Sequence, residues 1–227
     1  MPWDGTELHS AQMNSDGSIK TAKLIAGGSD ESITQPSWSP DGVLHFISDR
    51  SGWWNLYSYE NGEVTSLFEL DADFAGPDWL FGFSSYDFMA DSSIICTYQG
   101  GNRDVLVRIS RDGSEPEEIA NDYSSISHLS ILNDIIYFIG SSPMIPEAVV
   151  AISTSVKTID VIRRSRESIM ERSFISQAEF IEFDSTDGAK SYGLFYPPKH
   201  ALNQGVTGER PPLLVMSHGG PTSAASA

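Results

Sequence analysis

The stretch that decides the fold is Gln35–Leu70, which reads QPSWSPDGVLHFISDRSGWWNLYSYENGEVTSLFEL. Short runs of apolar residues alternate here with turn sequences, which is the pattern of antiparallel strands. Pro40-Asp41-Gly42 is one such turn, because proline fixes φ and glycine accepts a positive φ. Asn61-Gly62 is a strong hairpin signal. We therefore predict a four-stranded meander, with strands at Pro36–Ser39, Val43–Ser48, Trp53–Tyr59 and Glu63–Phe68.

The same four-stranded pattern occurs twice more, and half of it comes first. The second set comprises Trp79–Phe83, Ser93–Tyr98, Val105–Ile109 and Glu117–Ala120. The third set comprises Ile126–Ile131, Asp134–Ile139, Ala148–Ile152 and Thr158–Ile162. The half set comprises Glu7–Met13 and Thr21–Ile25. A four-stranded unit repeating every roughly 40–50 residues is typical of a β-propeller.

About three and a half blades are fewer than a closed ring requires, since propellers carry roughly 4–8 blades. A blade buries both faces of its sheet only when it has a neighbour on each side. We therefore predict a partial β-propeller over residues 1–164 and expect further sequence upstream of Met1.

The character of the sequence changes after the propeller. Residues 165–176 are charged and weakly helical, and we interpret them as a linker. Two runs, Glu179–Phe183 and Lys190–Tyr196, then predict a hairpin. Leu213–Met216 is apolar without alternation, which predicts a strand buried on both faces in the centre of an α/β sheet. We interpret residues 177–227 as the start of an α/β-hydrolase domain.

The last run leads directly into Ser217-His218-Gly219-Gly220-Pro221. In α/β-hydrolases, a backbone N–H from the loop after this strand helps to hold the negative oxygen of a tetrahedral intermediate. Glycine permits the close approach of the substrate carbonyl and the unusual φ/ψ of such a turn. One donor of this kind contributes roughly 3–4 kcal/mol of transition-state stabilisation. The alternative is an ordinary Gly-Gly turn with no catalytic role.

Taken together, these elements resemble the prolyl oligopeptidase family of serine peptidases, and within it the acylaminoacyl-peptidase and dipeptidyl-peptidase-like branch. The stretches that carry the resemblance are Met1–Leu8, Trp38–Gly42, Ser48–Tyr57, Gly193–Pro198 and Ser217–Thr222. The resemblance implies a propeller that screens substrates by size, in front of an α/β-hydrolase domain that cleaves small acyl- or aminoacyl-peptides. It also implies that the backbone N–H groups of Gly220 and Gly219 form the oxyanion hole.

The sequence departs from the family at the nucleophile. The family's serine lies in a Gly-x-Ser-x-Gly elbow after the oxyanion turn, followed by the aspartate and the histidine. No such elbow occurs here, and the nearest match, Gly82–Tyr86, lacks the second glycine. We therefore assign no catalytic serine, aspartate or histidine, and we expect this chain to be inactive alone. The four remaining histidines are interpreted as structural or solvated: His9, His45, His128 and His200.

Other suggestive residues are interpreted as packing or solvation. Trp53 and Trp54 face opposite sides of a strand, so one is expected to pack between blades and the other to face a rim. Asp71, Asp73 and Asp30-Glu31 do not have EF-hand spacing and are expected to be solvated loop carboxylates. No metal-ligand spacing or phosphate-binding glycine loop is present, so no metal or cofactor is expected.

Composition limits the partners. Against 31 acidic residues there are 14 basic ones, which gives a formal charge of −17. Such a surface repels phosphate backbones and anionic lipids, so neither nucleic acid nor a membrane is an expected partner. A single cysteine, Cys96, excludes an internal disulfide, and no signal pattern begins the chain, so we expect a cytoplasmic location. The family resemblance, and not the composition, implies small peptides as the substrates of the full-length enzyme.

Two other functions are compatible with parts of the sequence. A non-catalytic propeller that binds a peptide or protein would share the repeat but would not need the glycine turn. An esterase or lipase would share the His-Gly-Gly turn, but the propeller repeat argues against it.

Overall fold

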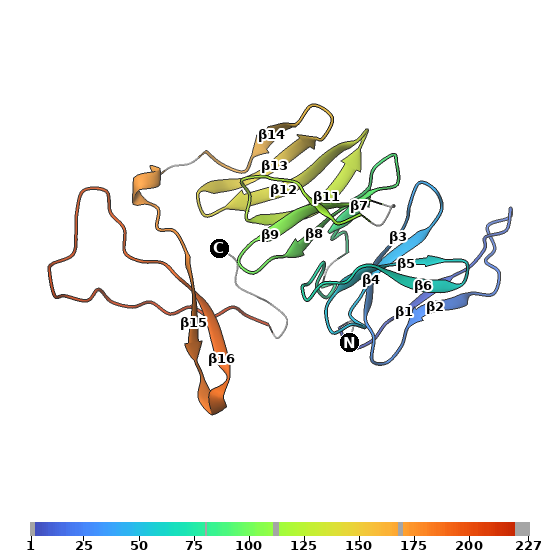
Figure 1. Cartoon of the computed structure of the whole chain (residues 1–227), viewed down its shortest axis with the longest axis horizontal. Coiled ribbons are helices and arrows are strands. Elements are labelled where there is room, and N and C mark those ends of the chain that lie inside the picture. The colour runs from blue at the N-terminus through green and yellow to red at the C-terminus, as the bar shows by residue number, and fades with distance from the viewer. Residues whose placement is uncertain (1–2, 80, 111–113, 168–169, 221–227) are drawn as a thin grey trace.

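The computed structural model describes residues 3–79, 81–110, 114–167 and 170–220, which form mainly antiparallel β-structure (Figure 1). Three sheets have four strands each in meander order, and two have two strands. We call them the half-sheet (β1–β2), sheet 1 (β3–β6), sheet 2 (β7–β10), sheet 3 (β11–β14) and the hairpin (β15–β16). The bounds are β1 Glu7–Ser10, β2 Lys23–Gly27, β3 Ile33–Trp38, β4 Leu44–Ser48, β5 Asn55–Glu60, β6 Glu63–Phe68, β7 Tyr86–Phe88, β8 Ile94–Gln99, β9 Asp104–Ile109, β10 Glu117–Glu118, β11 Ser125–Leu132, β12 Ile135–Ser142, β13 Ile145–Ser153, β14 Thr158–Arg164, η1 Arg172–Phe174, β15 Glu179–Asp184, η2 Thr186–Gly188 and β16 Lys190–Phe195.

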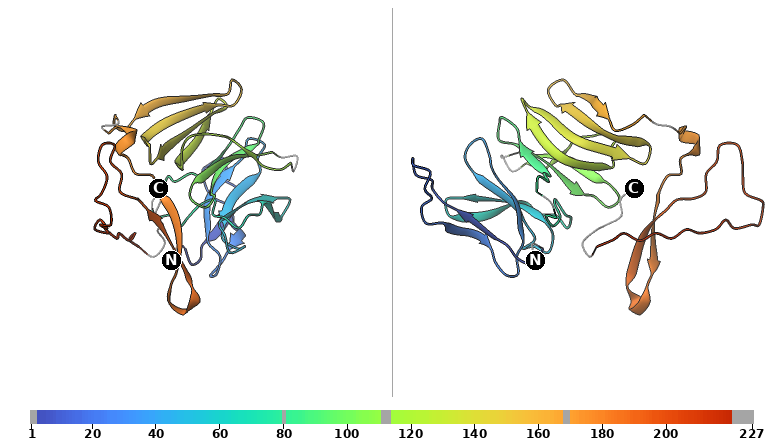
Figure 2. Two further views of the ribbon diagram at one scale, coloured as in Figure 1. Left: turned by 60° about the vertical axis from the view of Figure 1, so that its left-hand side comes forward. Right: turned by 180° about the vertical axis from the view of Figure 1, so that it is seen from behind.

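The prediction of a partial β-propeller is confirmed. The half-sheet and sheets 1 to 3 follow one another as consecutive units in an array that does not close into a ring (Figure 1, Figure 2). The turns form as their residues predict: Gly42 has φ +84°, and Asn61 and Gly62 have φ +54° and +94°. Two consecutive residues with positive φ give a type I′ turn, whose twist matches that of the flanking strands.

Strand alternation builds a separate apolar layer between each pair of sheets. Along β8, Ile94 and Cys96 point toward sheet 1, whereas Ile95 points toward sheet 3. On β4, Phe46 packs against the half-sheet and Ile47 packs against sheet 2. Because successive side chains of a strand face opposite sides, each inner sheet belongs to two cores at once.

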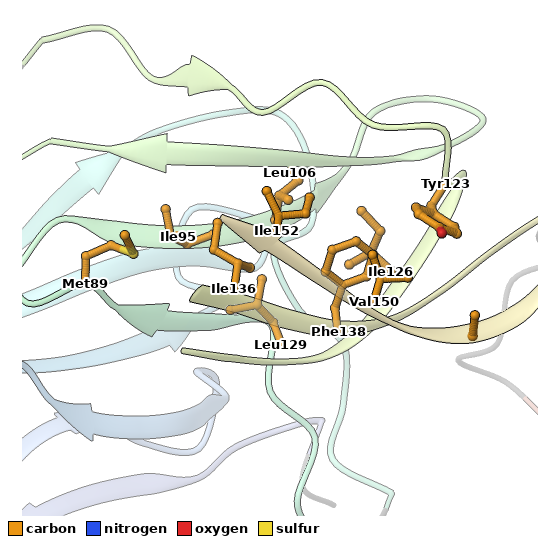
Figure 3. Packing of buried hydrophobic residues seen from close by; sticks show 11 residues of the cluster. Met89, Ile95, Leu106, Tyr123, Ile126, Leu129, Ile136, Phe138, Val150 and Ile152 are labelled. Atoms are coloured by element: carbon orange, nitrogen blue, oxygen red, sulfur yellow. The ribbon is translucent and has the colours of Figure 1, made fainter. Parts of the chain in front are cut away.

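The layer between sheets 2 and 3 contains the largest of these clusters (Figure 3). Leu106 on β9 meets Ile136, Phe138 and Val150 of sheet 3, and all four side chains are at most 1% exposed. The Phe138 ring also meets the Tyr123 ring edge to face, with 5.6 Å between centroids. Burial of such side chains contributes about 1.5–3 kcal/mol each relative to exposure.

Polar links join neighbouring sheets at their inner strands. The Asp104 carboxylate at the start of β9 accepts a 2.7 Å hydrogen bond from the Ile126 N–H of β11. The Asp87 carboxylate of β7 accepts another from the Ile131 N–H, also at 2.7 Å. These contacts satisfy N–H groups on the free edge of β11, which would otherwise be open to another strand.

Two predicted strands are wrong. The second set does not begin at Trp79–Phe83: its first strand is β7, and Trp79, Phe81 and Phe83 lie in the preceding loop with exposed side chains. Gly82 has φ +90°, which interrupts an extended run, and the Trp79 ring packs on Trp3 at 4.4 Å instead of on a sheet. The aromatic run favours a strand by composition, but a strand also needs a neighbouring sheet to bury its side chains, and composition does not encode that neighbour.

The second wrong strand is Leu213–Met216. These four residues have no strand conformation, and their side chains are 75–84% exposed. A strand forms only where a neighbour accepts its backbone hydrogen bonds, and no backbone hydrogen bond joins this run to another described residue. Gly219 and Gly220 follow it, while Pro221 to Ala227 lie outside the described residues.

The hairpin β15–β16 is confirmed, and it lies beside the array of sheets (Figure 1, Figure 2). The predicted linker at 165–176 contains one short helical turn, η1, among its described residues. No helix of the structure is long and apolar enough to cross a membrane, as judged on the described residues.

Candidate functional site

A cavity of about 1070 Å³ lies where loops of sheets 1 to 3 face the hairpin. Sheet 1 contributes Trp54, which directly precedes β5, and β8 contributes Tyr98. Tyr192 of the hairpin and His218 of the C-terminal segment line the same space. Residues separated by more than 150 positions therefore share one concave surface, which is the arrangement expected of a ligand site.

Aromatic side chains form two opposite walls of this cavity. On the propeller side, the Phe74 and Tyr98 rings lie 5.3 Å apart and Trp54 packs beside them. On the hairpin side, Phe180 stacks on Tyr192 at 5.7 Å, and these side chains are 53% and 60% exposed. Exposed aromatic faces in a concave site can bury an apolar side chain of a ligand.

Carboxylates lie between the aromatic groups. Asp73 accepts a 3.0 Å hydrogen bond from the Trp54 N–H, and Asp104 is held by the Ile126 N–H. Asp49 also lines the cavity. Burial raises the pKa of Asp104, and the hydrogen bond from Ile126 opposes that shift. Each backbone bond fixes the orientation of a carboxylate within the cavity wall.

One cation lines the cavity, as far as the described residues show. It is Arg103, whose guanidinium forms a 2.6 Å ion pair with Glu118 of β10. The pair compensates the charge of Arg103, so the lining is acidic overall. An acidic, aromatic cavity suits peptides with apolar side chains better than it suits anionic substrates.

The two glycines predicted for the oxyanion hole directly follow His218 in the chain, although neither glycine lines the cavity itself. Gly220 has φ +71°, a left-handed conformation that favours glycine. His218 lines the cavity, and its Nδ1 lies 3.3 Å from the Gly219 carbonyl oxygen. A Cβ built at either glycine meets no atom within 4 Å. Neither N–H donates to an acceptor within the part of the chain that the structure describes.

The hydroxyls of the nearest match to the elbow are engaged in structure. Ser84 Oγ donates a 2.6 Å hydrogen bond to the Leu129 carbonyl of sheet 3. Ser85 Oγ donates a 3.1 Å bond to Gln35 Oε1 of β3. Both serines therefore link neighbouring sheets, and neither is aligned with a histidine.

The remaining histidines occupy unrelated places, as the sequence predicts. His45 is buried between sheets 1 and 2, with its ring 4.9 Å from that of Phe88. Burial lowers the pKa of His45, an effect opposed by its contact with the Val43 carbonyl and by Glu60. His128 is exposed beside Phe83 and His200 packs on Phe174, far from each other in the sequence.

The structure brings in residues that the sequence did not identify as a group. Trp54 packs between sheets 1 and 2 as predicted, while Trp53 is 41% exposed. Asp73 and Glu31, expected to be solvated, instead hold structure: Glu31 binds Arg50 at 2.6 Å. The sequence gives only a weak indication that Phe180 and Tyr192 contact a ligand. They lie on one face of a two-stranded hairpin, which has no further strand or sheet to cover aromatic side chains.

This chain is similar to several solved structures, although no family model and no curated protein matches its sequence. A crystal structure of puromycin hydrolase is 30% identical with a TM-score of 0.92, and the match covers 100% of this chain and 34% of that one. A puromycin-hydrolyzing peptidase of Mycobacterium tuberculosis is 26% identical with a TM-score of 0.87, over 93% and 32%. Prolyl oligopeptidase B from Galerina marginata, at 11% identity and TM-score 0.67 over 84% and 27%, shares the fold. The chain thus spans about a third of the length of these proteins.

Proposed function

We propose that this chain is part of a serine peptidase of the prolyl oligopeptidase family. The proposal starts from its similarity to puromycin hydrolase and from the fold that it shares with prolyl oligopeptidases. The substrates would be small acyl- or aminoacyl-peptides, cleaved by Ser-His-Asp acyl transfer in a reducing, cytoplasmic compartment. The observation that carries the proposal is the match to puromycin hydrolase over the whole chain, at 30% identity.

In this proposal the chain supplies one side of the active site. Residues 1–164 form propeller blades, 165–176 the linker, and 177–227 the first strands of an α/β-hydrolase domain. The cavity is the substrate chamber, with Trp54 and Tyr192 contacting side chains of the peptide. The nucleophile, aspartate and histidine belong to a region of the enzyme outside this sequence.

The proposed chemistry assigns a defined task to the glycine turn. When a serine Oγ attacks the scissile carbonyl carbon, the carbonyl oxygen becomes negative. The N–H groups of Gly219 and Gly220 would donate to that oxygen, and they are available because no described residue accepts from them. Positioned donors of this kind stabilise the transition state more than the ground state, which raises kcat.

The test is a chimaera in which this chain replaces the matching third of a puromycin hydrolase. The chimaera should hydrolyse an aminoacyl-arylamide in a reaction blocked by a fluorophosphonate. Gly219→Pro removes one N–H and should lower kcat about 10²–10³-fold with little change in KM. Gly205→Pro, in an exposed loop of the same segment, is the matched control.

Two outcomes would contradict the proposal. A chimaera that folds and binds peptide without turnover would favour the non-catalytic binding module. Fluorophosphonate-sensitive turnover by the isolated chain would show that its own serines suffice, which would refute the assignment of the nucleophile to another region.

A further inference from the structure

A cluster of arginines at the end of β14 lies apart from the cavity and is not used by the proposed peptidase function. Arg163, Arg164 and Arg166 fall within four positions of a chain whose formal charge is −17. With Val161, Ile162 and Glu167, they line a second hollow of about 440 Å³. We call Val161, Ile162, Arg163, Arg164 and Arg166 the arginine surface.

These arginines have no acidic partner within 4.0 Å among residues 3–79, 81–110, 114–167 and 170–220. The arginines described in sheets 1 and 2 and their loops are instead paired, for example Arg50 with Glu31 and Arg103 with Glu118, both at 2.6 Å. Acidic residues outnumber basic ones by more than two to one in this chain, so three neighbouring unpaired arginines are unusual. Glu167 lies close in the lining but forms no ion pair with them.

A β-bulge shapes the arginine surface. Val150 of β13 pairs with Val161, and the adjacent Val149 pairs with Arg163, so Ile162 is an extra residue of β14. Bulges re-aim side chains and interrupt the regular edge that an added strand requires. Recognition at this place therefore relies on side chains and not on strand addition.

The chemistry of the arginine surface identifies its occupant. Arginine binds carboxylates with two parallel hydrogen bonds, and arginine beside apolar residues is typical of protein interfaces. Ile162 is 59% exposed and Val161 is 38% exposed, so an apolar contact is available next to the charges. The net negative charge of the protein would repel a long, uniformly anionic polymer. A short segment interacts mainly with charges within the Debye length of about 8 Å, and here those are the arginines.

We propose that the arginine surface binds a short acidic polypeptide segment that carries apolar residues. Arg163 and Arg164 pair with Val149 and Ala148 and so face opposite sides of β14, the outermost strand of sheet 3. The carboxylates of the segment therefore reach them around the outer edge of that strand and pair with Arg166 beyond its end, and an apolar side chain packs on Ile162. The outer strands of sheets 1 and 2 could not bind such a segment, because they carry Glu63 and the pair Glu117–Glu118, which would repel its carboxylates. The charge of the partner thus directs it to sheet 3.

The test uses a fluorescein-labelled ten-residue peptide of alternating Glu and Leu as the probe. Fluorescence anisotropy with the purified chain should show saturable binding that weakens as salt is raised from 50 to 300 mM, about the range over which charge screening grows. Replacing one arginine, for example by Arg163→Gln, should weaken binding about two- to fivefold, the effect of one exposed ion pair. The triple Gln variant should lose at least about tenfold.

Matched controls make the outcome decisive. Arg108→Gln removes a cation of β9 in sheet 2 that lines neither hollow and should leave the affinity unchanged, and circular dichroism reports whether each variant folds. No saturable binding, or equal losses from Arg108→Gln, would overturn the proposal. So would equally tight binding of tripolyphosphate or of a ten-nucleotide DNA, because charge alone would then explain the affinity. None of these results depends on peptidase activity.

Discussion

The packing between sheets 2 and 3 predicts a large, local loss of stability for Phe138→Ala. The Phe138 side chain is 1% exposed and contacts both its own sheet and sheet 2. Truncating a buried phenylalanine costs about 3–5 kcal/mol, because apolar contacts are lost and a cavity remains. Hydrogen-bonded strands on both sides limit collapse into the cavity. We therefore expect the free energy of unfolding to fall by about 4 kcal/mol, the middle of that range.

Urea unfolding followed by tryptophan fluorescence measures this loss. With a slope of about 2 kcal/mol per molar urea, the midpoint should fall by about 2 M. Phe81→Ala is the matched control: its side chain is fully exposed, and the free energy of unfolding should change by less than about 0.5 kcal/mol. A loss below about 1 kcal/mol for Phe138→Ala would refute the packing described here.

The same variant tests whether the array of sheets behaves as a chain of nearest neighbours. Each sheet shares a core only with the sheets beside it, so destabilisation should spread poorly along the array. Amide hydrogen exchange should accelerate in β8, β9, β12 and β13. The layer around Phe46 and Tyr57, between the half-sheet and sheet 1, should keep its protection. Uniform loss of protection would show that the array unfolds as one unit.

Three further predictions concern other buried groups. Burial lowers the pKa of His45, so the unfolded chain binds a proton more readily than the folded chain does. The stability of the fold should therefore decrease as the pH drops below about 6.5. His45→Asn should flatten this part of a plot of thermal midpoint against pH. Gly140→Ala places a Cβ 2.8 Å from the Tyr123 ring and should cost about 1–3 kcal/mol in chemical denaturation, whereas Gly205→Ala, with no atom within 4 Å, should be nearly neutral. Burial raises the pKa of the Cys96 thiol, which is 1% exposed, so a disulfide reagent should label it only as fast as the chain opens, and rapid labelling of the native chain would contradict the packing.

Much of the fold follows from local sequence. Alternation with a period of two marks the central strands, and Asn61-Gly62 and Pro40-Asp41-Gly42 fix turns because their backbone preferences are properties of single residues. The wrongly predicted strands lie where the conformational preference of single residues does not determine the secondary structure. Trp79–Phe83 and Leu213–Met216 are both apolar, yet neither has a neighbouring strand to complete its hydrogen bonds.

The sequence by itself determined the repeat, its antiparallel order and the position of Gly219 and Gly220 after an apolar run. Only the tertiary structure decided that Asp73, Trp54 and Tyr192 share one cavity and that Glu31 joins the half-sheet to sheet 1. The physical reason is range. Turn chemistry and strand alternation act between residues a few positions apart, whereas a cavity depends on how twisted sheets stack and where a distant hairpin comes to lie.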